Sequence, residues 1–72
     1  MKERTVTHQN HLCDAAKAHF VAKIAEARAH LDILFNYSVG IGEHTNLLDE
    51  VKKWTKELAE AEEGLATLEE NF

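Results

Sequence analysis

The second half of the chain carries an unbroken series of apolar residues at heptad spacing. The steps between them alternate between four and three residues, the spacing of the contact line, or seam, of a coiled coil. The series consists of Leu47, Val51, Trp54, Leu58, Ala61, Leu65, Leu68 and Phe72. A helix with one apolar stripe needs an apolar partner along its length. The spacing therefore predicts a helix over about residues 46–70 that packs against a second helix.

The first half of the chain supplies a matching helix. An alanine-rich helical pattern covers about residues 9–37, and residues 1–7 before it carry no periodicity and are expected to fray. Its main stripe consists of Cys13, Phe20, Ile24, Ala27, Leu31 and Leu34. Because each half of the chain supplies one long helix, the sequence predicts an all-α hairpin of two antiparallel helices, a single domain over residues 1–72.

The helical pattern stops between the two halves, over residues 38–45. We expect a structured turn there, built around Gly40, Gly42, Glu43 and His44. Gly40 is placed to take the left-handed conformation that ends many helices. Thr45 or Asn46 can cap the second helix. Because the connection is short, the two helices should be antiparallel neighbours.

The two stripes match well when the numbers of facing residues sum to about 81 or 82. The facing pairs are then Leu34 with Leu47, Leu31 with Val51, Ala27 with Trp54, Ile24 with Leu58, and Phe20 with Ala61. Each large ring faces a small side chain, which keeps a core densely packed. Gly64 is expected on a polar face of the second helix, where it weakens the helix slightly.

One seam cannot stabilise this chain alone. About a dozen apolar side chains, each stabilising the fold by about 1.5–3 kcal/mol, do not offset the entropy of ordering about 70 residues. Several apolar residues also fall outside the seam, namely Leu12, Val21, Ile33, Phe35, Tyr37 and Leu48. Phe35, Tyr37 and Leu48 lie near the turn and together would form a patch typical of an interface. We therefore expect a homodimer that forms a four-helix bundle, or an obligate protein partner.

The charge of the chain argues against nucleic-acid binding. The net charge of the 72 residues is −5, with +1 on residues 1–42 and −6 on residues 43–72. An acidic second half is poorly suited to nucleic-acid phosphates. The single cysteine suits a reducing compartment, and no apolar run approaches the length of a membrane span. We expect a cytoplasmic protein that binds neither nucleic acid nor membrane.

No catalytic or metal site can be assembled from the spacing of the polar residues. His8, His11 and Asp14 are three residues apart and could form at most a weak surface metal contact. The Glu-x-x-His pattern of di-metal bundles does not occur. Cys13 has no histidine or carboxylate three or four residues away to act as a base. We expect no enzyme activity, metal or cofactor, histidines in contact with solvent, and Trp54 as a core residue.

The turn and the acidic helix together resemble a known group of proteins. The run from Tyr37 to His44 contains Val-Gly-Ile-Gly-Glu-His, and it is followed by Leu-Leu-Asp-Glu at residues 47–50 and by Lys-Glu-Leu-Ala-Glu-Ala-Glu at residues 56–62. This pattern is similar to that of small uncharacterised helical-hairpin proteins of tailed phages of marine bacteria. Those proteins often have Pro-Asp where this chain has Thr45-Asn46. The resemblance implies a phage setting, with the host cytoplasm as location, and no specific activity.

The sequence thus favours a non-catalytic oligomerisation or adaptor module whose partner is itself or another protein. Helix-to-helix packing would be its mechanism, with the acidic face of the second helix influencing partner choice. Two alternatives remain open. One is a metal or small-ligand site in the core of a four-helix dimer. The other is an acidic decoy that occupies a basic surface on a nucleic-acid-binding protein.

Overall fold

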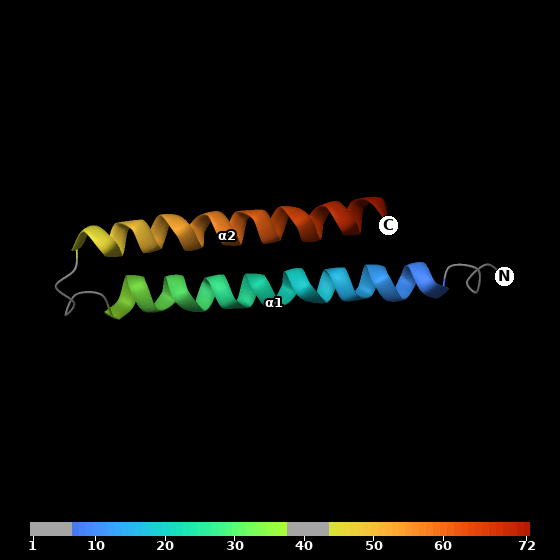
Figure 1. Ribbon diagram of the computed structural model, residues 1–72, viewed down its shortest axis with the longest axis horizontal. Helices are drawn as coiled ribbons and strands as arrows, with labels where there is room; N and C mark the ends of the chain where they lie inside the picture. Colours follow the sequence, from blue (N-terminus) through green and yellow to red (C-terminus); the bar gives the residue numbers. More distant parts are fainter. Residues whose placement is uncertain (1–6, 38–43) are drawn as a thin grey trace.

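Two long helices account for the whole of the described chain. A computed structural model describes residues 7–37 and 44–72, and the side chains within residues 11–36 and 46–72. Helix α1 (Thr7–Tyr37) and helix α2 (His44–Asn71) run antiparallel, side by side (Figure 1). The described residues contain no strand. The predicted all-α hairpin of two packed helices is confirmed.

The helix bounds differ from the predicted ones by about two residues. Helix α1 begins at Thr7, and helix α2 begins at His44 and ends at Asn71. The assignment of His44 to the turn is therefore wrong, and neither Thr45 nor Asn46 is the residue before the helix. No proline blocks an earlier start, and helix ends commonly shift by one or two residues. The predicted turn residues Gly40, Gly42 and Glu43 and the predicted frayed residues 1–6 lie outside the described residues.

The core is a thin line of side chains between the two helices. Four described apolar residues are buried: Ala27, Leu31, Trp54 and Ala61. Leu34, Val51 and Leu58 are partly buried and pack against the cluster that Ala27, Leu31 and Trp54 form. The large ring of Trp54 thus lies among small and aliphatic side chains, as interdigitated packing requires. Because two of the four buried residues are alanines, the core is small.

Near the end of each helix, an asparagine side chain donates a hydrogen bond to a backbone carbonyl of the same helix. The Nδ2 amide of Asn36 donates to the carbonyl oxygen of Asp32 at 2.8 Å, and that of Asn71 donates to the carbonyl oxygen of Thr67 at 2.7 Å. Each bond joins an asparagine to the carbonyl four residues before it, one turn back along the same helix. Phe72 follows the last turn and is 86% exposed. Its expected place in the seam is wrong, since so exposed a side chain does not pack between the helices.

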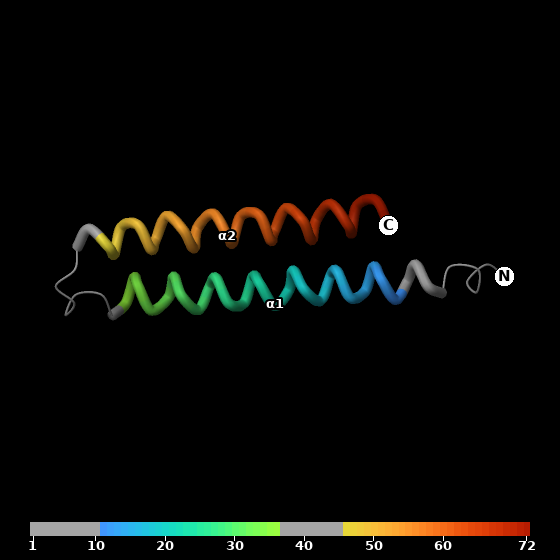
Figure 2. The backbone as a smooth tube through the Cα atoms, viewed as in Figure 1, coloured from blue at the N-terminus to red at the C-terminus, as the bar shows by residue number. Residues whose placement is uncertain are grey.

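The two helices stay side by side along the whole length of α2 (Figure 2). Helix α1 extends beyond α2 at the end where α2 stops (Figure 1). This arrangement leaves each helix with one neighbour only. Each therefore keeps an uncovered surface on both sides of the seam, and these two sides of the hairpin differ in chemistry.

Candidate interaction surface

On one side of the hairpin, polar and aromatic contacts connect the two helices. The ammonium of Lys23 on α1 lies 3.5 Å from a carboxylate oxygen of Glu57 on α2, and 3.6 Å from one of Glu26 on its own helix. The side chains of Lys23 and Glu57 are each 36% exposed, so solvent screens the pair. The pair helps to fix which residues of the two helices stand opposite each other.

His30 and Trp54 form a second contact on this side. Their ring centroids are 3.8 Å apart and the ring planes differ by 3°, so the rings lie flat on each other. The Nε1–H of Trp54 donates to a carboxylate oxygen of Glu50 at 3.2 Å, and the ammonium of Lys53 lies 4.9 Å from the ring centroid. His30 is exposed as predicted, yet it also covers Trp54, which is only 8% exposed. The sequence analysis predicted the exposure of His30 but not its contact with Trp54.

Phe20 packs directly onto Gly64 on the same side of the hairpin. A Cβ atom added to Gly64 would lie 2.7 Å from Cζ of Phe20, closer than side chains approach one another. The placement of Gly64 on a polar face is therefore wrong. The ring of Phe20 therefore contacts Gly64, and it also lines a hollow together with its predicted partner Ala61. His19 meets the ring of Phe20 edge-on, with centroids 5.2 Å apart.

The opposite side of the hairpin is open, and we call it the Phe35 face. On α1, a second heptad series lies one residue after the seam and consists of Asp14, Val21, Arg28 and Phe35, all of them exposed. Val21 and Phe35 are 54% and 64% exposed, which is unusual for large apolar side chains that share one stripe. The α1 edge of this face therefore holds two exposed apolar side chains and one charge of each sign.

The α2 edge of the Phe35 face is apolar near the turn and acidic away from it. A heptad series one residue after the seam contains Leu48, Thr55, Glu62 and Glu69, all of them exposed. Leu48 is 60% exposed and lies in the first turns of α2, close to the end of α1 that carries Phe35. The two edges thus place apolar residues together at the turn end, where α1 stops and α2 starts.

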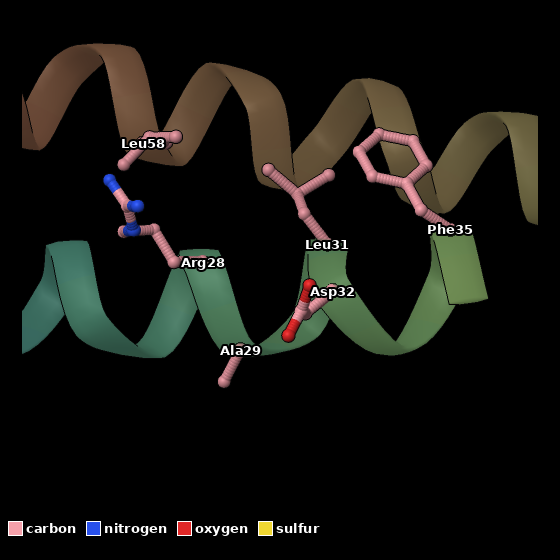
Figure 3. A pocket seen from close by; sticks show the side chains of 6 residues that line it. All are labelled: Arg28, Ala29, Leu31, Asp32, Phe35 and Leu58. Atoms are coloured by element: carbon pink, nitrogen blue, oxygen red, sulfur yellow. The ribbon is translucent and has the colours of Figure 1, made fainter. Parts of the chain in front are cut away.

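A shallow hollow marks the middle of the Phe35 face. It measures about 340 Å³, and the residues around it include Arg28, Leu31 and Phe35 from α1 and Leu58 from α2. Figure 3 shows Leu31 and Phe35 rising from α1 toward α2, whereas Ala29 points away. Leu31 and Leu58 line the hollow, and so do the guanidinium group of Arg28 and the carboxylate of Asp32. Its lining is therefore mixed, with apolar groups and charges of both signs.

The predicted interface and core residues fall into three groups. Ala27, Leu31, Trp54 and Ala61 are buried in the seam. Phe20, Ile24, Leu34, Leu47, Val51, Leu58, Leu65 and Leu68 are partly buried, and so is Cys13. Phe35 and Leu48 are exposed on the Phe35 face, and the side chain of Tyr37, the last residue of α1, is not described. Sequence reasoning missed the contacts of His30 and Gly64, both within four residues of a seam residue.

The described part of the chain contains neither a cluster of metal-ligating side chains nor a membrane-spanning helix. Among residues 7–37 and 44–72, no three histidine, cysteine or acidic side chains come together in a way that could hold a metal ion. Neither α1 nor α2 is long and apolar enough to cross a membrane. Comparisons of the chain with protein-family models, with curated proteins and with solved structures found no match.

Proposed function

We propose that the protein is a non-catalytic association module, whose hairpin is completed by another helical surface. That surface is a second copy, which gives a four-helix bundle, or a different protein. The resemblance of residues 37–62 to phage hairpin proteins suggests a phage accessory protein as the setting. The exposed apolar side chains of the Phe35 face provide the binding energy, and the charged edges select the partner.

The observation that carries this proposal is the poor compactness of the isolated chain. Its radius of gyration is 17.0 Å, whereas a compact domain of this length has a radius of about 11 Å. Only four of the described apolar residues are buried. No large side chain among them is fully buried. A hairpin with so little core needs further apolar burial to fold stably. Packing against another helical surface would provide it.

Sedimentation equilibrium on protein without an affinity tag tests the proposal. One chain has a mass of 8.1 kDa, and we expect a helical species of at least twice that mass at micromolar concentration. A poorly helical monomer would point to a different protein as the partner. A fully helical, stable monomer would contradict the proposal, because it would need no second surface.

A further inference from the structure

We propose that a basic amphipathic helix of another protein docks on the acidic half of the hairpin, over a hollow beside Gly64. This inference rests on the proposed function and names the chemistry of one partner. The hollow lies on the side of the hairpin where Phe20 packs on Gly64 and Lys23 pairs with Glu57. The docking surface, which we call the Gly64 hollow, is therefore separate from the Phe35 face.

The Gly64 hollow combines apolar groups with carboxylates. It measures about 480 Å³ and is lined by residues of both helices. Its lining includes Ala16 and Phe20 from α1 and Glu60, Glu63, Gly64 and Leu68 from α2. The contact between α1 and α2 buries the four apolar residues only in part. Apolar surface therefore remains uncovered at this place, and both charged groups that line it are negative.

The negative charge of the chain is concentrated in this half of the hairpin. Residues 57–72 contain six glutamates and neither lysine nor arginine. The residues of α1 that lie opposite, about residues 9–24, contain one aspartate and two lysines. These two segments together carry a net charge of −5, which is the net charge of the whole chain. A surface of one sign attracts a partner of the opposite sign.

The two carboxylates of the Gly64 hollow are available to a partner. Glu60 forms an ion pair with Lys56 at 3.8 Å, and both side chains are more than 60% exposed. Such a solvated pair is weak and can be exchanged at little cost. Within the described residues, Glu63 forms no ion pair. Glu57, one turn earlier, differs from both because Lys23 of α1 already lies beside it.

The end of α2 increases the demand for positive charge. Its last turn contains Glu69 and Glu70 but no basic residue. The carbonyl groups at the end of a helix carry a partial negative charge, so cations stabilise this end and carboxylates destabilise it. The sequence of α2 therefore departs from the usual helix chemistry at the end of the hairpin that carries the Gly64 hollow. A cationic partner would supply the charge that α2 lacks.

Lysine and arginine side chains suit this combination of groups, because each has an aliphatic stem and a cationic end. The stem can lie on Phe20 and Leu68 while the cation reaches the carboxylates. Glu60 and Glu63 are three residues apart and so lie on one face of α2, as do basic residues three or four apart on a partner helix. The apolar residues of that helix would cover the rest of the hollow. A nucleic acid or an acidic membrane surface would be repelled.

Two matched double variants test the site with a defined probe. The probe is a fluorescent amphipathic peptide of leucine and lysine, about 18 residues or five helical turns long. We expect Glu60→Gln with Glu63→Gln to weaken its binding about fivefold or more, because two charge pairs are lost. Glu62→Gln with Glu69→Gln removes the same charge from the α2 edge of the Phe35 face and should leave binding within about twofold. Fluorescence anisotropy measures both.

Equal weakening by the two double variants would overturn the site, because the peptide would then respond only to the overall charge. Absence of binding to the unchanged protein would overturn it as well. A peptide with glutamate in place of every lysine is the control for charge, and it should not bind.

Chemical-shift mapping on the full chain locates the bound peptide. The largest shifts of backbone amides are expected around Ala16, Phe20 and Gly64. Shifts centred on Phe35 and Leu48 would overturn the Gly64 hollow as the docking surface and would place the peptide on the Phe35 face.

These experiments can fail without the proposed function, which sedimentation of the chain alone tests. An oligomer whose two double variants bind the peptide equally would keep the association module and overturn the Gly64 hollow as its docking surface.

Discussion

The contact between Phe20 and Gly64 requires a residue without a Cβ atom. We expect Gly64→Ala to destabilise the protein by about 1–2 kcal/mol, because the added methyl group overlaps the ring of Phe20. Alanine is the better helix former by about 1 kcal/mol, so this sign opposes what helix propensity alone predicts. Thermal or urea unfolding measures the difference.

The matched control removes the ring. In a Phe20→Ala background, Gly64→Ala should become neutral or stabilising, because only the helix propensity remains. The two substitutions therefore form a double-mutant cycle whose coupling energy reports the contact. If Gly64→Ala stabilises the protein with Phe20 in place, the ring does not pack on the glycine.

His30 determines how much of Trp54 meets water. We expect His30→Ala to move the fluorescence emission of Trp54 to longer wavelength, since the histidine ring covers one face of the indole. Loss of the stacked pair should also lower the free energy of unfolding by about 0.5–1.5 kcal/mol. Trp54 is the single tryptophan of the chain, so its emission has one source.

His19→Ala is the control for the fluorescence experiment. His19 lies on the same helix, but it contacts Phe20 instead of Trp54. This substitution should leave the emission wavelength unchanged. Identical shifts in the two variants would mean that the emission reports a general loosening of the hairpin and not the stack.

The sequence predicts which residues lie in the seam, but it does not predict every contact between single residues. Trp54 and Ala27 could be placed in the seam because heptad spacing alone fixes which residues face the partner helix. The contacts of His30 and Gly64 depend on how far each helix rotates about its own axis, which spacing does not determine. One signal was available, because a single glycine inside a long helix weakens it unless a close contact compensates.

At the scale of the helices, Ala27 is the most completely buried of the described core residues. It is 0% exposed and contacts the cluster of Leu31 and Trp54. We expect Ala27→Leu to destabilise the hairpin by about 1–3 kcal/mol, because the added atoms have no space between the helices. Unfolding monitored by circular dichroism measures the loss.

Ala29→Leu is the matched control for that substitution. Ala29 is exposed and points away from α2 (Figure 3). The chemical change and the helix propensities are the same at both positions, so Ala29→Leu should change the free energy of unfolding by less than about 0.5 kcal/mol. Equal losses at the two positions would mean that the seam is misplaced.

The two helices also differ in how clearly the sequence marks their role. In α2 the seam residues are apolar and most of the others are charged, so the buried stripe can be identified directly. In α1, apolar residues such as Val21, Ile33 and Phe35 occur on several sides of the helix, and all three are exposed. A stripe between α1 and α2 alone does not explain these positions. They are explained by a further protein surface that packs on α1 in addition to α2.

At the scale of the whole molecule, the account depends on the coupling of folding to association. Two helices that share a core of a few residues bury little apolar surface for their length. Length and composition were enough to predict this deficit, because a single seam between two helices cannot bury enough apolar surface. They could not indicate which side of the hairpin is covered, since that depends on the contacts that close the other side.

The most direct test is the temperature of unfolding measured over a hundredfold range of protein concentration. If the helical species is an oligomer, mass action raises the midpoint as the concentration rises. The account predicts such a rise, together with loss of helix on dilution at constant temperature. A midpoint independent of concentration in a fully helical protein would show that the hairpin folds alone, and would contradict the central claim that a second surface completes it.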